Sequence, residues 1–357
     1  MIRNAALILP MNSLSISKLF SIIILFIGVP VLAEAQSGGF AGAYTRMGFG
    51  PRGMATGNVL SATGQHGIYA HYNPAVAALT QGNQIDLSSA LMSYDRTLHS
   101  LNATFPLPPQ AGLSVGLLNA NVSDIDGRSS SGYDTGSLST HEYQLFVAFG
   151  LNLGTRAQIG TSVKLQLADF HNDIGSARGA GFDVGLIVEP IQNLKASIVI
   201  QDLLATYNWN TDDLYGGQSS RNRGDDFPTR FKFGLTFEPS EEWFVASEFE
   251  VQRINSEVFI RSLTGDGPVR SSRNLDEIQT SEELFRIGGG YRVHERITAR
   301  AGLEVGNLDD FEQSYKPSAG FSLHLPFDQY QPTIDYAWVR EPTGISHMHV
   351  IAFQLNL

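Results

Sequence analysis

Residues 141–167 read HEYQLFVAFGLNLGTRAQIGTSVKLQL, and this stretch decides the fold class. Apolar residues hold nearly every second position on both sides of a short turn at 154–156: Tyr143, Leu145, Val147, Phe149, Leu151 and Leu153 before it, and Ile159, Val163, Leu165 and Leu167 after it. A period of two places alternate side chains on opposite faces of a strand, whereas in a helix it would scatter them around the axis. The stretch therefore predicts two strands, each with one apolar face.

The same alternation recurs from residue 84 to the end of the chain. Turn residues divide this region into fourteen expected strands: 84–94, 98–106, 112–124, 141–153, 157–170, 178–189, 194–206, 229–238, 243–256, 283–293, 297–307, 315–325, 331–340 and 346–357. Strands that cross a membrane need about 9–11 residues, and outer-membrane barrels of one chain have an even number of them. The segment lengths and their number both favour such a barrel.

The connectors between these expected strands alternate in length. Short turns follow every second strand, at 107–111, 154–156, 190–193, 239–242, 294–296 and 326–330, and the other connectors include three long polar ones at 125–140, 207–228 and 257–282. Short turns at one rim and long loops at the other are typical of outer-membrane barrels. We therefore predict an all-β fold, a transmembrane antiparallel β-barrel of about 14 strands over 84–357, with both ends of the mature chain at the short-turn rim. A secreted soluble β-sandwich or β-helix is the alternative, because alternation alone also fits it.

The composition excludes several classes of function. The 357 residues contain 24 Lys and Arg against 35 Asp and Glu, a net charge of −11, so an extended nucleic-acid-binding surface is not expected. The absence of cysteine excludes a disulfide scaffold, a cysteine-based zinc site and a thiol nucleophile.

Residues 1–35 have the pattern of an export signal. Lys18 precedes an apolar run at 19–29, Pro30 ends the run, and Ala33-Glu34-Ala35 is a small-x-small cleavage site. The run is shorter than the roughly 18–20 residues that span a bilayer, although an uncleaved anchor is the alternative. We predict a cleaved Sec-type signal peptide and a place in the outer membrane of a Gram-negative cell, in contact with outer-membrane lipids.

Residues 36–83 differ from both neighbouring regions. They are rich in glycine and alanine and only weakly periodic, too apolar for a solvated tail and too long for a simple leader. We expect them to form a compact N-terminal hatch, or plug, inside the barrel lumen, where the glycines would permit tight turns and close contact with the wall. A flexible periplasmic extension is the alternative.

Motifs along the chain resemble those of a known family. They are Gly48-Phe49-Gly50-Pro51-Arg52-Gly53-Met54, Gly57, Tyr72-Asn73-Pro74-Ala75, the loop 123–128 with 135–137, and Ile334-Asp335-Tyr336-Ala337-Trp338. This order is similar to the PorV/PorQ family of Bacteroidetes-type outer-membrane proteins, which is related to the FadL long-chain fatty-acid transporters. The resemblance implies a 14-stranded barrel closed by a hatch whose motif residues are Gly48, Gly50, Arg52, Gly57, Asn73, Pro74 and Ala75.

The resemblance also implies two functions. FadL-type members pass hydrophobic molecules through a kinked strand and a lateral opening, and PorV-type members serve the type IX secretion system. We expect passive passage of hydrophobic small molecules, with a component of the secretion system that binds cargo or partner proteins through its loops as the alternative.

Two further features of the barrel region suggest functional positions. Six charged residues fall on the expected inner face, where they would either lock the wall to the hatch or gate solute passage: Glu248, Glu250, Arg286, Arg292, Arg300 and Glu304. Alternation slips at Leu117-Leu118, which predicts a β-bulge and a possible lateral opening there.

Three short motifs suggest other chemistry. Gly48-x-Gly50-x-x-Gly53 matches a dinucleotide fingerprint but lacks the strand before it. The match of 112–116 to G-x-S-x-G would make Ser114 a lipase nucleophile, although alternation continues through it. Asp124, Asp126 and Asp134 could surround calcium, but the EF-hand spacing is absent. We expect no enzyme activity, no cofactor and no metal.

Overall fold

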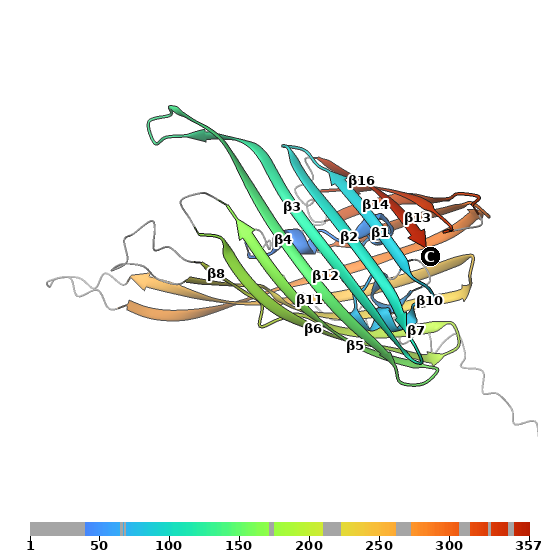
Figure 1. Cartoon of the computed structure of the whole chain (residues 1–357). Coiled ribbons are helices and arrows are strands. Elements are labelled where there is room, and N and C mark those ends of the chain that lie inside the picture. The colour runs from blue at the N-terminus through green and yellow to red at the C-terminus, as the bar shows by residue number, and fades with distance from the viewer. Residues whose placement is uncertain are drawn as a thin grey trace, which may run out of the picture. The chain divides into compact units, whose positions relative to one another are not determined.

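The computed structural model describes residues 40–64, 67, 69–170, 175–209, 223–261, 273–306, 315–327, 330–341 and 346–357. The chain divides into two compact units, Met1–Leu32 and Ala33–Leu357, and every described residue belongs to the second (Figure 1). The predicted signal peptide at 1–35 lies outside the described residues.

Fourteen strands of the described chain close into one antiparallel ring. They are β1 Gln84–Leu91, β2 Arg96–Leu107, β3 Ala111–Arg128, β4 Asp134–Asn152, β5 Ala157–Asp169, β6 Ala177–Ile191, β7 Leu194–Leu203, β10 Thr229–Ser240, β11 Trp243–Arg261, β12 Arg273–His294, β13 Ile297–Val305, β14 Tyr315–His324, β15 Thr333–Arg340 and β16 His347–Asn356. Each pairs with its neighbours in this order, and β16 pairs with β1 to close the ring. The predicted barrel is confirmed, and one closed ring excludes a two-sheet sandwich.

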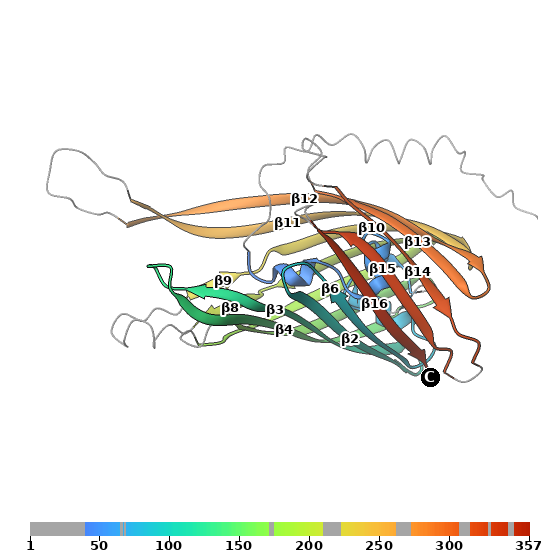
Figure 2. The same cartoon turned by 90° about the horizontal axis from the view of Figure 1, so that it is seen from above.

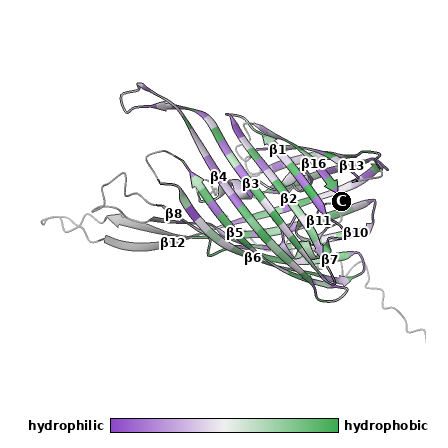
Figure 3. Cartoon of the chain, viewed as in Figure 1, coloured by the Kyte–Doolittle hydropathy of each residue, from purple (hydrophilic) through white to green (hydrophobic). Residues whose placement is uncertain are grey.

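The two faces of the wall differ as the alternation predicts. In β5 the side chain of Lys164 is fully buried, whereas its neighbour Leu165 is 53% exposed. In β12 the guanidinium of Arg286 is buried and Phe285 is 43% exposed. Figure 3 shows this alternation along the strands as successive green and purple bands. A wall with apolar side chains outside and charged side chains inside is typical of a barrel surrounded by lipid.

The long polar connectors are in large part strands, so their predicted extents are wrong. β3 continues to Arg128 and β4 begins at Asp134, while β11 and β12 reach Arg261 and Arg273. The region 207–228 carries most of a separate hairpin, β8 Thr206–Trp209 and β9 Arg223–Asp226, which pairs with β6 outside the ring. Apolar alternation is weak in the sequence of these stretches, so hydrophobic periodicity did not reveal the pairing.

The β-bulge predicted at Leu117-Leu118 is wrong. Leu117 pairs with Leu101 and Leu145, and Leu118 pairs with Ser100 and Gln144, without a shift of register. Leu118 is an ordinary inward-facing residue that is apolar because it packs inside the lumen, where it is completely buried. The two register shifts of β3 against β4 lie farther along, between Val122 and Ile125 and between Gly127 and Arg128.

An N-terminal segment, residues 40–82, lies against the inner faces of the strands (Figure 2). Its helices are short: η1 Ala43–Arg46, α2 Gly50–Ala55, η2 Leu60–Ala62 and η3 Pro74–Leu79. α2 contacts β13, β14, β15, β16 and β1, and η3 contacts β2 to β6 on the other side. Among the described residues, no helix has the length and apolar character needed to cross a membrane.

A row of inward-facing glycines provides the surface on which η3 lies. Gly112, Gly150, Gly160 and Gly185 pair in register across β3, β4, β5 and β6. A Cβ atom on any of them would fall 1.9–2.5 Å from atoms of residues 73–78. Only glycine therefore leaves room for the backbone of η3 at Gly112, Gly150 and Gly160, and for the side chain of its cap Asn73 at Gly185.

The C-terminal end lies at the predicted rim, whereas the predicted N-terminal end of the mature chain, residue 36, lies outside the described residues. Leu357 N–H donates to the Asn83 carbonyl (2.8 Å) at the short-turn rim, as predicted. Ala41 instead packs near the long-loop rim, against a cluster that includes Tyr207 and Phe227. These aromatic residues cover the first described residues of the chain.

The substitution Gly160→Ala tests whether the close contact between η3 and the glycine row stabilises the protein. The new Cβ would lie 2.4 Å from the backbone nitrogen of Ala75, which cannot move aside as a flexible side chain can. We expect a loss of about 1–3 kcal/mol of stability, measured as a lower temperature at which the folded band disappears in heat-modifiability gels. The control is Gly82→Ala, whose Cβ would meet only the Leu357 carbonyl oxygen, at 3.6 Å. Equal temperatures for the two variants would contradict this role.

Candidate functional site

The lumen combines an apolar sector with a polar remainder. The apolar sector consists of inward-facing residues from β1, β2, β3, β15 and β16: Ala90, Leu98, Leu118, Val339, Met348 and Val350. They belong to one buried cluster with Phe49 and Met54 of the N-terminal segment, and Met47 packs against it. An apolar patch inside the charged lumen of a barrel is the feature that requires a functional explanation.

Phe49 lies at the centre of this cluster. Its ring stacks on His71 with 5.0 Å between centroids, and it meets Tyr69 and Phe146 edge-on at 5.9 and 5.7 Å. Phe49 N–H donates to the hydroxyl of Tyr72 (2.8 Å). Burial and the nearby positive charges of Lys164 and Arg230 lower the pKa of His71 well below its usual range, so this ring is neutral.

Arg52 of the predicted hatch motif joins α2 to the wall. Its Nε donates to Asp335 Oδ2 on β15 (3.0 Å), and both side chains are buried. Burial alone would lower the pKa of Arg52, but the Asp335 carboxylate raises it above its ordinary value, so the guanidinium stays charged. On β1, which is separated from β15 by β16, Asp86 accepts a hydrogen bond from the Tyr69 hydroxyl (3.0 Å).

The other motif residues shape the segment itself. Asn73 caps η3, since its Oδ1 accepts from Ala75 N–H (2.9 Å) while its Nδ2 donates to the Ser61 carbonyl (2.6 Å). Pro74 occupies the first turn of η3, where its missing N–H costs nothing. Three motif glycines have positive φ angles, namely Gly48, Gly50 and Gly57.

Four of the six predicted lumen charges form one network in the wall. Arg286 Nη1 lies 2.6 Å from Glu250 Oε2 and 3.1 Å from Glu248 Oε1, and its Nε bonds to Glu304. Lys316 pairs with Glu304, and Lys232 lies 3.4 Å from Glu250. Three acids and three bases therefore meet on β10 to β14. Sequence reasoning missed Lys232 and Lys316, although both occupy inward positions of the alternation.

The remaining two charges lie elsewhere. Arg300 is buried and donates to the Ser322 hydroxyl, whereas Arg292 is exposed at the short-turn rim. The six residues therefore do not form one gate, and their roles in locking or gating stay predictions.

A second buried network escaped the sequence analysis. Lys164 Nζ lies 2.8 Å from both Asp183 Oδ2 and Asp202 Oδ1, and Arg230 Nη2 lies 2.6 Å from Asp202 Oδ2. The two acids and two bases come from β5, β6, β7 and β10. Inward alternation marks Lys164 and Arg230, but the partners depend on the register, which the sequence does not display.

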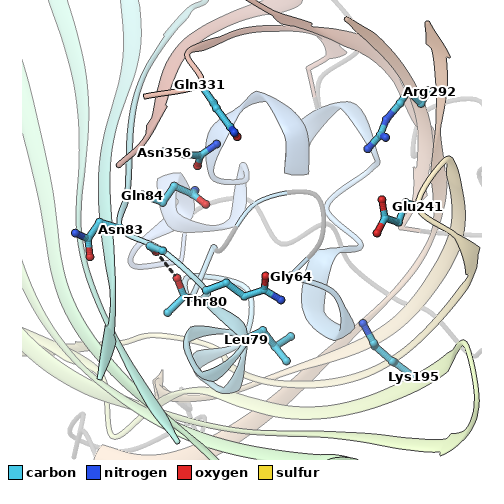
Figure 4. A pocket seen from close by; sticks show the side chains of 12 residues that line it. Gly64, Leu79, Thr80, Asn83, Gln84, Lys195, Glu241, Arg292, Gln331 and Asn356 are labelled. Atoms are coloured by element: carbon cyan, nitrogen blue, oxygen red, sulfur yellow. Dashed lines mark hydrogen bonds between the residues drawn. The ribbon is translucent and has the colours of Figure 1, made fainter. Parts of the chain in front are cut away.

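Two cavities lie on opposite sides of the N-terminal segment. A vestibule of about 590 Å³ opens at the short-turn rim between Gln84, Gln331 and Asn356 on one side and Lys195, Glu241 and Arg292 on the other (Figure 4). A crevice of about 20 Å³, the size of one water, lies between α2 and β14–β16. The vestibule is mostly polar, whereas Met47, Met54, Val339 and Met348 line the crevice.

The residues of the lipase-like and calcium-like motifs lie in strand positions. Ser114 lies within β3 and donates to Asn102 Oδ1 (2.9 Å), so it does not occupy the strand-to-helix turn of a nucleophile elbow. Asp126 pairs with Arg128 at 2.8 Å on the exposed β3–β4 hairpin. Within the described ranges, no group of three or more His, Asp or Glu residues could hold a metal ion.

Comparisons with known proteins show the fold. No family model matches the chain, and no curated protein matches it. The Pseudomonas putida toluene transporter TodX is 15% identical, with a TM-score of 0.59 over 87% of this chain and 99% of that one. The monoaromatic hydrocarbon channel CymD (12%, TM-score 0.59, 87% and 98%) and a Pseudomonas aeruginosa FadL homologue (11%, 0.58, 86% and 97%) are also similar.

The structural neighbours are thus hydrocarbon channels and a FadL homologue. The resemblance to the PorV/PorQ family stays a prediction, because no match by sequence family supports it.

Removing the bond between α2 and the wall tests how the N-terminal segment is held. Arg52→Gln leaves Asp335 buried without its cation, which costs about 3–5 kcal/mol. We expect a higher conductance in planar bilayers, and partial recovery in the double variant Arg52→Gln with Asp335→Asn. The control is Arg128→Gln, because Arg128 and its partner Asp126 have side-chain exposures of 57% and 63%. Unchanged conductance in Arg52→Gln would contradict this anchoring role.

Proposed function

We propose that the chain is an outer-membrane channel through which uncharged or weakly polar hydrophobic molecules pass passively. The observation that carries this proposal is the apolar sector inside a lumen that also buries many polar and charged side chains. Filling a lumen for stability alone would not require methionines and leucines beside a small cavity. The similarity of fold to the toluene transporter and to the FadL homologue supports the same function.

The N-terminal segment would act as the hatch of this channel. It separates the apolar sector from the polar vestibule, and its residues 40–82 contact the wall on both sides. A solute would enter from the long-loop side, rest against the apolar sector, and reach the vestibule when part of the segment moves. Because the vestibule is polar, it would hold a hydrophobic molecule only weakly. The molecule would therefore leave it readily, down its concentration gradient.

The proposed place of the barrel is the outer membrane of a Gram-negative cell. The outward leucines and phenylalanines would contact lipid, and the apolar run at 19–29 with its cleavage site would direct export. Neither a contact nor a comparison favours the alternative function in type IX secretion, so we do not propose it.

Two substitutions on neighbouring strands test the function in opposite directions. Leu118 and Gln144 face each other across β3 and β4, and both are fully buried. Leu118→Gln shrinks the apolar sector, and Gln144→Leu enlarges it. We expect host cells that produce the chain to take up labelled p-xylene severalfold more slowly with Leu118→Gln and at least as fast as the parent with Gln144→Leu.

Uptake of a hydrophilic sugar by the same cells is the control for nonspecific leakage and should not differ between the variants. The amide atoms of Gln144 have no hydrogen-bond partner among the described residues, so its replacement by leucine is not expected to destabilise the barrel. Uptake of p-xylene that is no faster with the chain than without it would overturn the proposed function.

A further inference from the structure

All methionines beyond the predicted signal peptide gather at one place in the lumen. The chain has six methionines, and two of them, Met1 and Met11, fall within residues 1–35. Met47, Met54 and Met348 line the crevice between α2 and β14–β16, and the fourth, Met92, packs against the same cluster. Methionine side chains are flexible and polarisable, so they can move apart to admit an apolar molecule and close again.

Three of the four charged residues that line this crevice are in ion pairs. Lys316 bonds to Glu304, which also accepts from Arg286, and Arg96 bonds to Glu341. The fourth, Arg340, has its guanidinium 4.3 Å from the centroid of the Tyr315 ring. A ligand carboxylate would lie beside two buried acids, Glu304 and Glu341.

One hydrogen-bond acceptor at the crevice is not satisfied. Glu341 lines the crevice and is only 1% exposed. Its Oε2 accepts from Arg96, but its buried Oε1 has no hydrogen-bond partner among the described residues, which exclude 342–345. A buried acceptor left without a donor is unfavourable, because it has lost its hydrogen bonds to water. An ionised carboxylate can only accept hydrogen bonds, so the group that fits this oxygen is a donor.

From this geometry we infer that the crevice binds an uncharged apolar molecule with one hydroxyl group, such as a phenol or an alkanol. The apolar body lies among Met47, Met54 and Met348, and the hydroxyl donates to Glu341 Oε1. Carboxylates of the same shape are rejected by the two acids. This inference rests on the proposed function, since it names the class of solute that the channel selects.

Three matched ligands test the inference: p-cresol, p-xylene and p-toluate, which share a methylbenzene body. The full mature chain in lipid nanodiscs, labelled with ¹³C at its methionine methyl groups, is titrated at pH 7. The signals of Met47, Met54 and Met348, assigned by Met→Leu substitutions, report binding at the crevice. Met92 does not line the crevice and is the internal reference, and empty nanodiscs correct for partition into lipid.

We expect p-cresol to bind about tenfold more tightly than p-xylene, because its hydroxyl bonds to a charged acceptor, and p-toluate to bind most weakly. In Glu341→Gln the preference for p-cresol should fall and p-toluate should bind more tightly. The matched control is Glu238→Gln, since Glu238 is also buried and paired, with Lys195 at 2.7 Å, but does not line the crevice.

In the unmodified chain, equal binding of p-cresol and p-xylene overturns the inference, and so does binding of p-toluate that is tighter than that of p-cresol. This test does not depend on whether Glu341→Gln folds. An unchanged ligand order in folded Glu341→Gln overturns the inference as well. Failure of the proposed function is recognised separately, because cells would then show no uptake of p-xylene while the methionine signals still report the order of binding.

Discussion

An edge strand leaves a row of backbone N–H and C=O groups unpaired, and the rest of this structure depends on how the sheet avoids such an edge. The sheet closes into a ring, because β16 pairs with β1 along the whole of β1. Closure with a period of two then sends one side chain in two outward and the next into the lumen. The lumen must be filled by groups that the strands cannot themselves provide.

The lumen is filled in two ways, which hold different parts of the structure together. Charged residues on neighbouring strands form neutral networks around Arg286 and around Asp202, each member of which has an opposite charge within reach. On β3 to β6 the wall has no side chains at the glycine row, and the backbone of η3 takes their place. The charged networks hold strand to strand, whereas the glycine row holds the N-terminal segment.

The sequence predicted the parts of the fold that have an apolar outer face. All fourteen ring strands were located, and their ends at the short-turn rim were placed within two residues, because the outward apolar residues mark them. Where the strands leave the apolar band, as in β3 beyond Val122 and in β12 before Glu283, periodicity fades while pairing continues, and the predicted loops were too long. The apolar Leu118 was wrongly interpreted as a sign of a β-bulge. Its side chain points inward and is apolar because it packs in one cluster with residues of the N-terminal segment, and no local sequence pattern reveals such a tertiary contact.

The site was predictable only in part, and for a similar reason. Alternation indicates that Arg286 and Glu250 point inward, but the partners of Lys164 and Arg52 depend on register and on a segment distant in sequence. The hatch motif marked Arg52 and Asn73, whose contacts now have physical explanations. Glu341 carried no signal, because a single glutamate after a strand is usually solvated, and only its burial beside three methionines makes it notable.

The contacts of the N-terminal segment also indicate which part of it can move. η3 and its cap Asn73 lie directly on four glycines, so any shift would lose close contact along four strands at once. The C-terminal end of α2 is held in a similar way, because a Cβ atom at Gly288, Gly302 or Gly320 would fall 2.0–2.7 Å from atoms of residues 55–56. The Arg52–Asp335 ion pair and a hydrogen bond from Ser318 to the Ala55 carbonyl (3.1 Å) add to this contact. The methionine side chains of the segment, Met47 and Met54, pack in the apolar cluster, and thioether side chains adapt at low cost. The apolar sector lies on the α2 side, so we expect a solute bound there to displace these methionine side chains while α2 and η3 stay in place.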